Sequence, residues 1–420
     1  GAQIYGEAAT LGAATTLTST GSGAITFGNT LNGAQTLAIN TSGGTTFTGA
    51  VGNTTALTSV TTDVGGSVAI NGSVAINGGV VNTTGAQIYG EAATLGAATT
   101  LTSTGSGAIT FGNTLNGAQT LAVNTSGVTT FTGAVGDSMA LTSLTTDAGT
   151  AGSVAINGGV VNTTGAQIYG EAATLGAATT LTSTGSGAIT FGNTLNGAQT
   201  LAINTSGVTT FTGAVGNTTA LSSITTDAGG SVAINGGVVN TTGAQIYGEA
   251  ATLGVATTLT STGSGAITFG NTLNGEQTLV INTSGVTTFT GAVGDSTALT
   301  SLTTDAGTAG SVAINGGVVN TTGAQIYGEA ATLGAATTLT STGSGAITFG
   351  NTLNGAQTLV VNTSSVTTFT GAVGNSTALT SLTTDAGTAG SVAINGSVVN
   401  TTGAQIYGEA ATLGAATTLT

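Results

Sequence analysis

The most informative feature of this 420-residue sequence is what it lacks: it contains no Lys, Arg, His, Pro, Cys or Trp. Without an imidazole, an amine or a thiol, the chain cannot use His- or Lys-based acid–base catalysis, a Cys nucleophile or a His/Cys metal site. Its Ser hydroxyls have no basic side chain to activate them. We therefore expect no enzyme activity, no catalytic residue, no cofactor and no bound metal.

The charge balance excludes further classes of protein. The chain has fourteen Asp and Glu residues and no basic residue, so its formal net charge is −14. Such a chain would be repelled by phosphate backbones, so we expect no nucleic-acid partner. A membrane span needs about 20 consecutive apolar residues, and Thr, Ser, Asn or Gly interrupts every apolar run, so we expect none. Because 39% of the residues are hydrophobic and only 3% are charged, the composition favours a folded chain over a disordered one.

An internal repeat dominates the sequence. The string GAQIYGEAATLG begins at Gly1, Gly85, Gly165, Gly243 and Gly323, and its start recurs at Gly403. We interpret residues 1–420 as one continuous repeat array with repeats 1–84, 85–164, 165–242, 243–322 and 323–402 and a partial repeat 403–420. Since the array begins and ends within the pattern, we expect it to be part of a longer protein.

Within one repeat the apolar residues alternate with small polar ones. In the first repeat the alternating residues all fall on odd numbers: Leu17, Ile25, Phe27, Leu31, Leu37, Ile39, Phe47, Val51 and Leu57. This period of two, with Gly- and Asn-rich turns between short runs, is typical of β-strands. The repeats differ in length only after a shared Asp and always by an even number, as where Ser67–Gly72 duplicates Ser73–Gly78. An even insertion keeps the alternation of faces intact.

The repeat also divides approximately into four stretches of 20 residues, beginning with GAQIYGEAATLGAATTLTST. This period predicts an all-β fold, a β-solenoid (parallel β-helix) of roughly 20-residue coils with about four coils per repeat. The alternative is a tandem array of ~80-residue β-sandwich domains, against which stand the missing linkers and the missing Trp core anchor. We expect Tyr5 and its five counterparts, like Phe27 and Phe47, to be core or stacking residues.

Two repeated acidic positions are the candidate functional residues. They are Glu7, Glu91, Glu171, Glu249, Glu329 and Glu409, and Asp63, Asp147, Asp227, Asp305 and Asp385. They could act as calcium ligands or as a carboxylate pair. With four coils per repeat, equivalent carboxylates would lie roughly 19 Å apart, too far to share an ion. We therefore expect solvated turn carboxylates that keep the chain soluble.

Threonine and asparagine patterns suggest two further sites, each with a simpler interpretation. Pairs such as Thr16 and Thr18 could form an ice-binding ladder, but Thr is also a favourable outward strand residue. Asn40, Asn53 and Asn82 match the N-x-[ST] glycosylation pattern. Asn is equally suited to turns and to stacked amide ladders.

Stretches such as GAITFGNTLNGAQTLAIN and TSGVTTFTGAVGNTTAL resemble the Gly/Thr-rich strand repeats of giant bacterial surface and secreted proteins, including filamentous-haemagglutinin-like adhesins. This resemblance implies an extracellular β-helical shaft without catalytic residues in its repeats. We expect a non-enzymatic fibre, sheath or stalk at the cell surface that self-associates end to end or laterally. The alternatives are an adhesin shaft that contacts glycans or surfaces, and an ice-binding solenoid.

Overall fold

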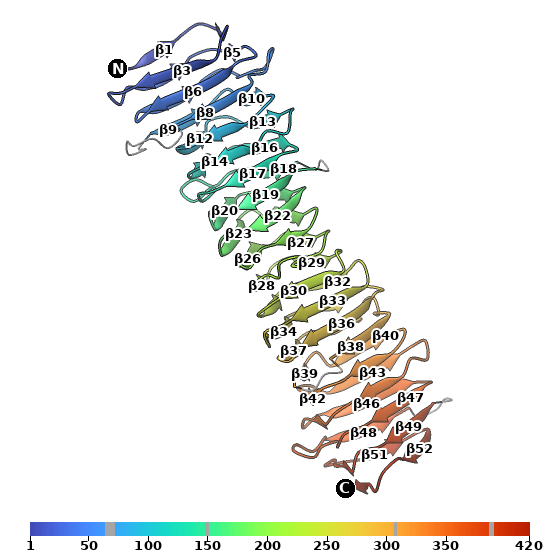
Figure 1. The fold of residues 1–420 in the computed structure, drawn as a ribbon. Coiled ribbons are helices and arrows are strands. Elements are labelled where there is room, and N and C mark those ends of the chain that lie inside the picture. The colour runs from blue at the N-terminus through green and yellow to red at the C-terminus, as the bar shows by residue number, and fades with distance from the viewer. Residues whose placement is uncertain (64–71, 148–150, 306–308, 386–389) are drawn as a thin grey trace. The chain divides into compact units, whose positions relative to one another are not determined.

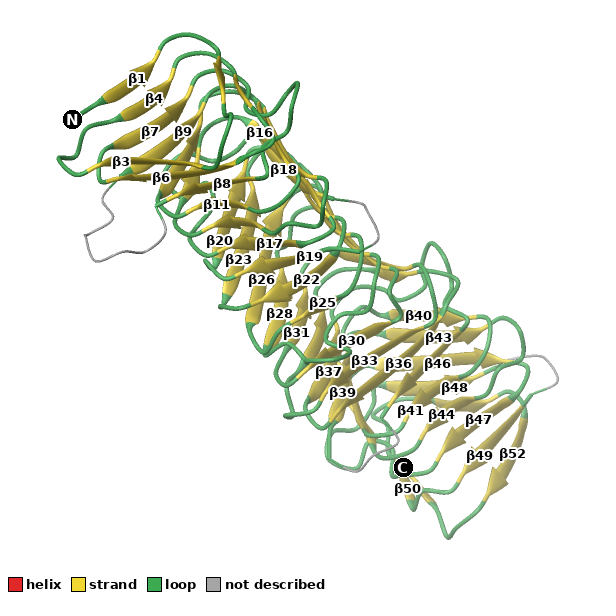
Figure 2. Ribbon diagram, turned by 45° about the horizontal axis from the view of Figure 1, so that its top comes forward, coloured by secondary structure: helices red, strands yellow, loops and turns green. Residues whose placement is uncertain are grey.

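The computed structural model describes residues 1–63, 72–147, 151–305, 309–385 and 390–420, whose regular structure is all β-strand (Figures 1 and 2). The chain forms two compact units, Gly1–Gly213 and Ala214–Thr420. In each unit, strands about 22 residues apart in the sequence stack in parallel. This confirms the predicted β-solenoid. The sandwich alternative is wrong, because its sheets would be antiparallel.

The strands of the N-terminal unit form three parallel stacks, and each coil contributes to each of the three faces one strand or, as at Val51 and Val135, one isolated bridge residue. The first stack contains β1 (Gln3–Tyr5), β4 (Ile25–Phe27), β7 (Gly44–Phe47), β9 (Ser73–Ile76), β12 (Ala92–Leu95), β15 (Leu115–Asn116), β20 (Val160–Thr163), β23 (Thr179–Ser183) and β26 (Thr200–Thr205). The second contains β2 (Ala9–Thr10), β5 (Leu31–Asn32), β10 (Val80–Thr83), β13 (Thr99–Ser103), β16 (Thr120–Thr125), β18 (Ser143–Thr146), β21 (Gln167–Tyr169), β24 (Ile189–Phe191) and β27 (Val208–Phe211). The third contains β3 (Thr15–Ser19), β6 (Thr36–Thr41), β8 (Ser59–Thr62), β11 (Gln87–Tyr89), β14 (Ile109–Phe111), β17 (Val128–Phe131), β19 (Ser153–Ile156), β22 (Ala172–Leu175) and β25 (Leu195–Asn196).

The C-terminal unit has the same three-stack arrangement. One stack contains β28 (Ser223–Thr226), β31 (Gln245–Tyr247), β34 (Ile267–Phe269), β37 (Val286–Phe289), β39 (Ser311–Ile314), β42 (Ala330–Leu333), β45 (Leu353–Asn354), β50 (Val398–Val399) and β53 (Thr418–Leu419). Another contains β29 (Ser231–Ile234), β32 (Ala250–Leu253), β35 (Leu273–Asn274), β40 (Val318–Thr321), β43 (Thr337–Ser341), β46 (Thr358–Thr363), β48 (Ser381–Thr384) and β51 (Gln405–Tyr407). The last contains β30 (Val238–Thr241), β33 (Thr257–Ser261), β36 (Thr278–Thr283), β38 (Ser301–Thr304), β41 (Gln325–Tyr327), β44 (Ile347–Phe349), β47 (Val366–Phe369), β49 (Ser391–Ile394) and β52 (Ala410–Leu413).

The core is built from the alternation seen in the sequence. In β13, Leu101 points inward and is fully buried, and its neighbours Thr100 and Thr102 point outward. Leu101 stacks on Val123 of the next coil, which is also fully buried. Repeated from coil to coil, such contacts produce a mainly apolar interior, in which some inward positions carry buried Thr, Ser, Gln and Glu side chains. The duplicated residues Ser67–Gly72 lie almost entirely outside the described residues.

Glycine allows neighbouring coils to approach closely at the corners. Gly275 follows the short strand β35 and has φ +130°. A Cβ atom there would lie 2.4 Å from the Leu253 carbonyl oxygen of the coil before it. A side chain would therefore clash with backbone as well as strain φ, so the corner requires glycine.

The coil is slightly longer than the 20 residues predicted from the sequence. From Gln87 the hydrogen-bonded register steps to Ile109, Thr129, Val154 and Ala173, and the mean step in the structure is about 22 residues. An 80-residue repeat therefore spans about 3.6 coils and not four. Equivalent residues of successive repeats consequently lie on different faces and do not recur in one column at every fourth coil.

The aromatic side chains show this rotation directly. In the N-terminal unit, Tyr5–Phe27–Phe47 stack in the first stack, Tyr89–Phe111–Phe131 in the third and Tyr169–Phe191–Phe211 in the second. Ring centroids within these ladders are 5.0–5.7 Å apart. The prediction that Tyr and Phe stack between coils is confirmed.

The stacking of buried apolar side chains predicts how much a core substitution should destabilise the protein. Leu302 in β38 is fully buried between Leu279 and Gln325. Leu302→Ala should lower the free energy of unfolding by about 2–5 kcal/mol, because it removes apolar contacts and leaves a cavity. Val286→Ala, at a site that is 43% exposed, is the matched control and should change it by less than ~0.5 kcal/mol. Urea unfolding followed by circular dichroism measures both, and equal effects would contradict the assignment of the core.

Candidate functional site

The two repeated acidic positions lie close together on adjacent coils, and the predicted solvation of the glutamates is wrong. Glu91, Glu171, Glu249 and Glu329 are only 1–3% exposed. Each Glu follows an inward-facing Tyr by two residues, as Glu91 follows Tyr89, so the strand alternation turns it inward. Of the other two glutamates at this repeated position, Glu7 on the first coil is exposed and Glu409 is half-buried.

The backbone holds each Asp beside a Glu of the following coil. At the end of β8, the Asp63 amide donates to the Ile39 carbonyl (2.8 Å), and Asp63 Oδ1 accepts a hydrogen bond from the Thr41 amide (2.8 Å). On the other side, the Gly90 amide donates to the Thr62 carbonyl (2.9 Å). A Cβ atom at Gly90 would lie 2.1 Å from the Asp63 carbonyl oxygen. Glycine before the glutamate therefore lets the two acidic segments approach.

The same neighbour relation recurs in four Asp–Glu steps, which we define as the pairs Asp63–Glu91, Asp147–Glu171, Asp227–Glu249 and Asp305–Glu329. In two of them a threonine hydroxyl donates to the glutamate: Thr146 Oγ1 to Glu171 Oε2 (2.8 Å) and Thr304 Oγ1 to Glu329 Oε2 (3.0 Å). Thr384 Oγ1 donates in the same way to Glu409 Oε2 (3.1 Å).

Burial dominates the electrostatics of these steps. It raises the pKa of each of the four buried glutamates above its ordinary value of 4.5, and the carboxylate of the neighbouring Asp raises that pKa further. The threonine hydroxyls act in the opposite direction, because they stabilise the ionised form. Burial also raises the pKa of Asp63 and Asp305. The chain has no basic side chain to compensate these charges.

A second buried polar group was missed by the sequence reasoning. Gln87 is fully buried, and its Nε2 donates to the Thr102 carbonyl (2.9 Å) and to the Val81 carbonyl (3.1 Å). Its Oε1 accepts from the Tyr89 hydroxyl (3.0 Å). Gln167, Gln245 and Gln325 repeat this arrangement. The invariant Gln-Ile-Tyr triplet in every repeat was the available signal. The group cross-links coils and carries no reactive chemistry.

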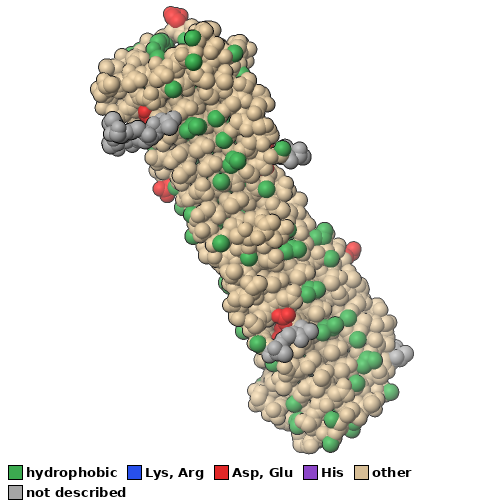
Figure 3. Space-filling model, viewed as in Figure 1, with side chains coloured by type: hydrophobic (Ala, Val, Ile, Leu, Met, Phe, Trp, Pro, Cys, Tyr) green, Lys and Arg blue, Asp and Glu red, His purple; other side chains and the backbone are tan. Residues whose placement is uncertain are grey.

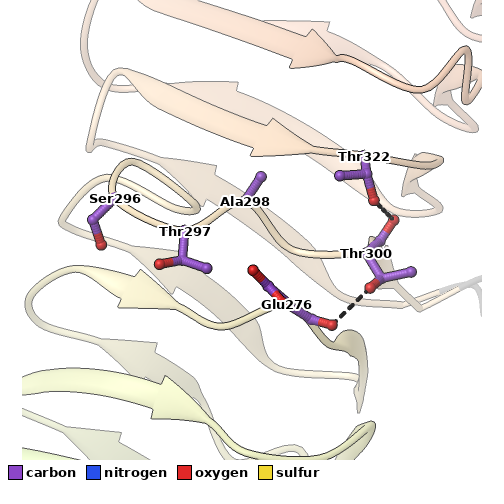
Figure 4. A pocket seen from close by; sticks show the side chains of 6 residues that line it. All are labelled: Glu276, Ser296, Thr297, Ala298, Thr300 and Thr322. Atoms are coloured by element: carbon purple, nitrogen blue, oxygen red, sulfur yellow. Dashed lines mark hydrogen bonds between the residues drawn. The ribbon is translucent and has the colours of Figure 1, made fainter.

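One open hollow of about 550 Å³ lies on the surface of the C-terminal unit. Figure 4 shows its lining: Glu276, Ser296, Thr297, Ala298, Thr300 and Thr322. Thr300 Oγ1 donates to the Glu276 carbonyl (2.9 Å), and no basic group stands near the carboxylate because the chain has none. The other repeats have Ala in place of Glu276, as at Ala118, so this hollow is not a repeated site.

The structure also shows where the threonine pairs and the candidate glycosylation asparagines lie. In the hydrogen-bonded register, outward Thr100 and Thr102 stand beside Ala122 and Asn124, so the Thr-x-Thr pairs do not continue from coil to coil there. Asn53 is exposed at a turn, whereas Asn40 and Asn82 are half-buried. Asn82 Nδ2 donates to the Gly52 carbonyl of the coil before it (3.4 Å). Asn82 and Asn40 lie within the strands β10 and β6, so of the three only Asn53 has the turn position expected.

No protein-family model, no curated protein and no solved structure matches this chain. Within the described ranges there is no helix of the length and hydrophobicity that a membrane crossing requires. The Asp–Glu steps, which recur with the repeat and bury ionisable groups, are therefore the candidate site that the geometry itself defines.

The raised pKa values predict how stability depends on pH. The unfolded chain releases the glutamate protons near pH 4.5, but the folded chain holds them to higher pH. In buffer with a chelator, stability should be greatest below about pH 4.5 and should fall as the pH rises through the folded pKa. Thermal unfolding measured from pH 4 to pH 8 tests this.

The matched variants are the triple substitution Glu171→Gln, Glu249→Gln and Glu329→Gln, and the exposed control Glu276→Gln. The triple variant should lose most of the pH dependence, and the control should keep it. A Tm that rises with pH in the unsubstituted chain would contradict the burial of ionisable glutamates.

Proposed function

We propose that this chain is the repetitive, non-enzymatic shaft of an extracellular fibre, sheath or stalk. The observation that supports this proposal best is the coil-on-coil hydrogen bonding within each unit, which continues through every repeat without a change of architecture. A solenoid of this kind gains stability with each added coil, because each coil contacts only its neighbours. Such an array is suited to spanning distance and not to enclosing a substrate.

The surface chemistry supports the same proposal. Outward strand positions carry mainly Thr, Ala and Asn, and only Glu7, Asp137, Glu276 and Asp295 are exposed carboxylates. Figure 3 shows how sparse acidic side chains are on the face drawn. Because so few charges repel, copies of the chain could pack side by side at physiological salt. Lateral association into filaments is therefore part of the proposal.

The resemblance to filamentous-haemagglutinin-like repeats supports a bacterial, cell-surface location. Adhesion is the alternative function: the exposed Asn53 turn and the outward Thr side chains would then contact glycans. The two functions make different predictions for isolated repeats, because a shaft needs no saturable ligand and an adhesin does.

Electron microscopy of the purified chain tests the shaft proposal. We expect elongated particles or filaments whose abundance rises with protein concentration, and no binding on a glycan array. The chain offers no Lys or Arg for trypsin, so prolonged trypsin treatment should leave the particles unchanged. Compact, dispersed particles of about 40 kDa would contradict the shaft, and saturable glycan binding would favour the adhesin. A protein of this mass, 39.3 kDa, is large enough for either shape to be recognised.

A further inference from the structure

Two of the four Asp–Glu steps contain buried carboxylate oxygens without a hydrogen-bond partner. At the first step, Asp63 Oδ2 and both carboxylate oxygens of Glu91 are buried without a close hydrogen-bond partner. Asp227 Oδ1 and both carboxylate oxygens of Glu249 are in the same condition. Buried polar atoms without partners are rare in folded proteins. Here carboxylate oxygens without partners occur at two of the four Asp–Glu steps, and unpaired threonine hydroxyls occur at one other repeated position, that of Thr45.

These oxygens are held in place by the fold. Thr62 is fully buried at the end of β8, and Asp63 is fixed by its hydrogen bonds to Ile39 and Thr41 on the coil before it. Glu91 comes from the coil after it and is 1% exposed. The buried Thr62 hydroxyl beside Glu91 is a donor that lowers the pKa of Glu91. The two carboxylates come from adjacent coils and are near enough for the charge of Asp63 to raise the pKa of Glu91.

The charge at each step has no compensation within the chain. Two neighbouring carboxylates repel each other, and burial makes an isolated charge costly. Lys, Arg and His are absent, so a compensating charge must come from solution. The ligand atoms are all oxygens, which selects hard cations over the softer metals that prefer nitrogen or sulfur.

We propose that each Asp–Glu step binds one divalent cation of the Ca²⁺ class between adjacent coils. Ca²⁺ accepts six to eight oxygens in irregular arrangements, whereas Mg²⁺ demands a near-ideal octahedron. The described residues contain no group of three or more Asp, Glu, His or Cys side chains, so two carboxylates and a threonine hydroxyl form the protein part of the site. So few charged ligands suggest a Kd of about 10⁻⁴–10⁻³ M. The ion would join one coil to the next and stabilise the solenoid.

The tyrosines supply a direct probe of this site. The chain has no Trp, and a Tyr lies two residues before each Glu of the steps, as Tyr247 does before Glu249. Tb³⁺, which binds calcium sites, should therefore show tyrosine-sensitised luminescence on the full-length chain. Millimolar Ca²⁺ should displace it. In chelator-treated protein at pH 7, saturating Ca²⁺ should also raise Tm by at least about 5 °C.

The controls separate the proposed site from general attraction to an acidic protein. Glu171→Gln, Glu249→Gln and Glu329→Gln together leave one of the four steps intact, so Ca²⁺-displaceable luminescence should fall about fourfold. Glu276→Gln removes an exposed carboxylate and should leave it unchanged. Far-UV circular dichroism verifies that the triple variant retains its strands.

Two results would overturn the proposal. One is luminescence that Ca²⁺ does not displace, or that the triple variant retains in full. The other is a Tm that rises on acidification but does not respond to Ca²⁺ at pH 7, which would mean that a shared proton compensates each carboxylate pair.

Discussion

The parallel hydrogen-bond ladder between coils is the interaction on which the structure depends. Each coil satisfies its backbone donors and acceptors on the coils before and after it, as the Asn82 amide does on Val51 and the Thr100 amide does on Gly79. Pro cannot donate in such a ladder. The absence of Pro from the sequence is therefore what this ladder requires.

The length of the coil determines where each repeated residue lies. Since about 22 residues complete a coil, the repeat of about 80 residues ends partway round, and the next copy begins on another face. The Tyr–Phe ladders and the Asp–Glu steps are thus distributed around the solenoid and not aligned in one column. This distribution keeps buried carboxylates of different repeats apart while placing an Asp and a Glu of adjacent coils together.

Much of this fold could be predicted from the sequence, because alternation and repetition are local signals. The odd-numbered set that includes Leu17, Ile39 and Phe47 correctly identified inward residues. The coil length could not be predicted as well from the sequence. The corners between strands differ in length from coil to coil, and dividing the repeat by four hides these differences. The buried glutamates were mispredicted because charge was weighted above position. Glu7 shares the odd parity of Tyr5 and Leu11, and that parity predicts an inward direction.

The account rests on a register in which neighbouring coils pair residues about 22 apart, and a pair of spin labels tests it most directly. The chain has no native Cys, so nitroxides can be placed at Thr102→Cys and Asn124→Cys, register partners on β13 and β16. Adjacent parallel strands are about 4.8 Å apart, so the spectrum should show strong dipolar broadening. A control pair at Thr102→Cys and Thr182→Cys, one repeat apart on different stacks, should show none. A spectrum of the first pair equal to the sum of the two singly labelled variants would contradict the register and the solenoid with it.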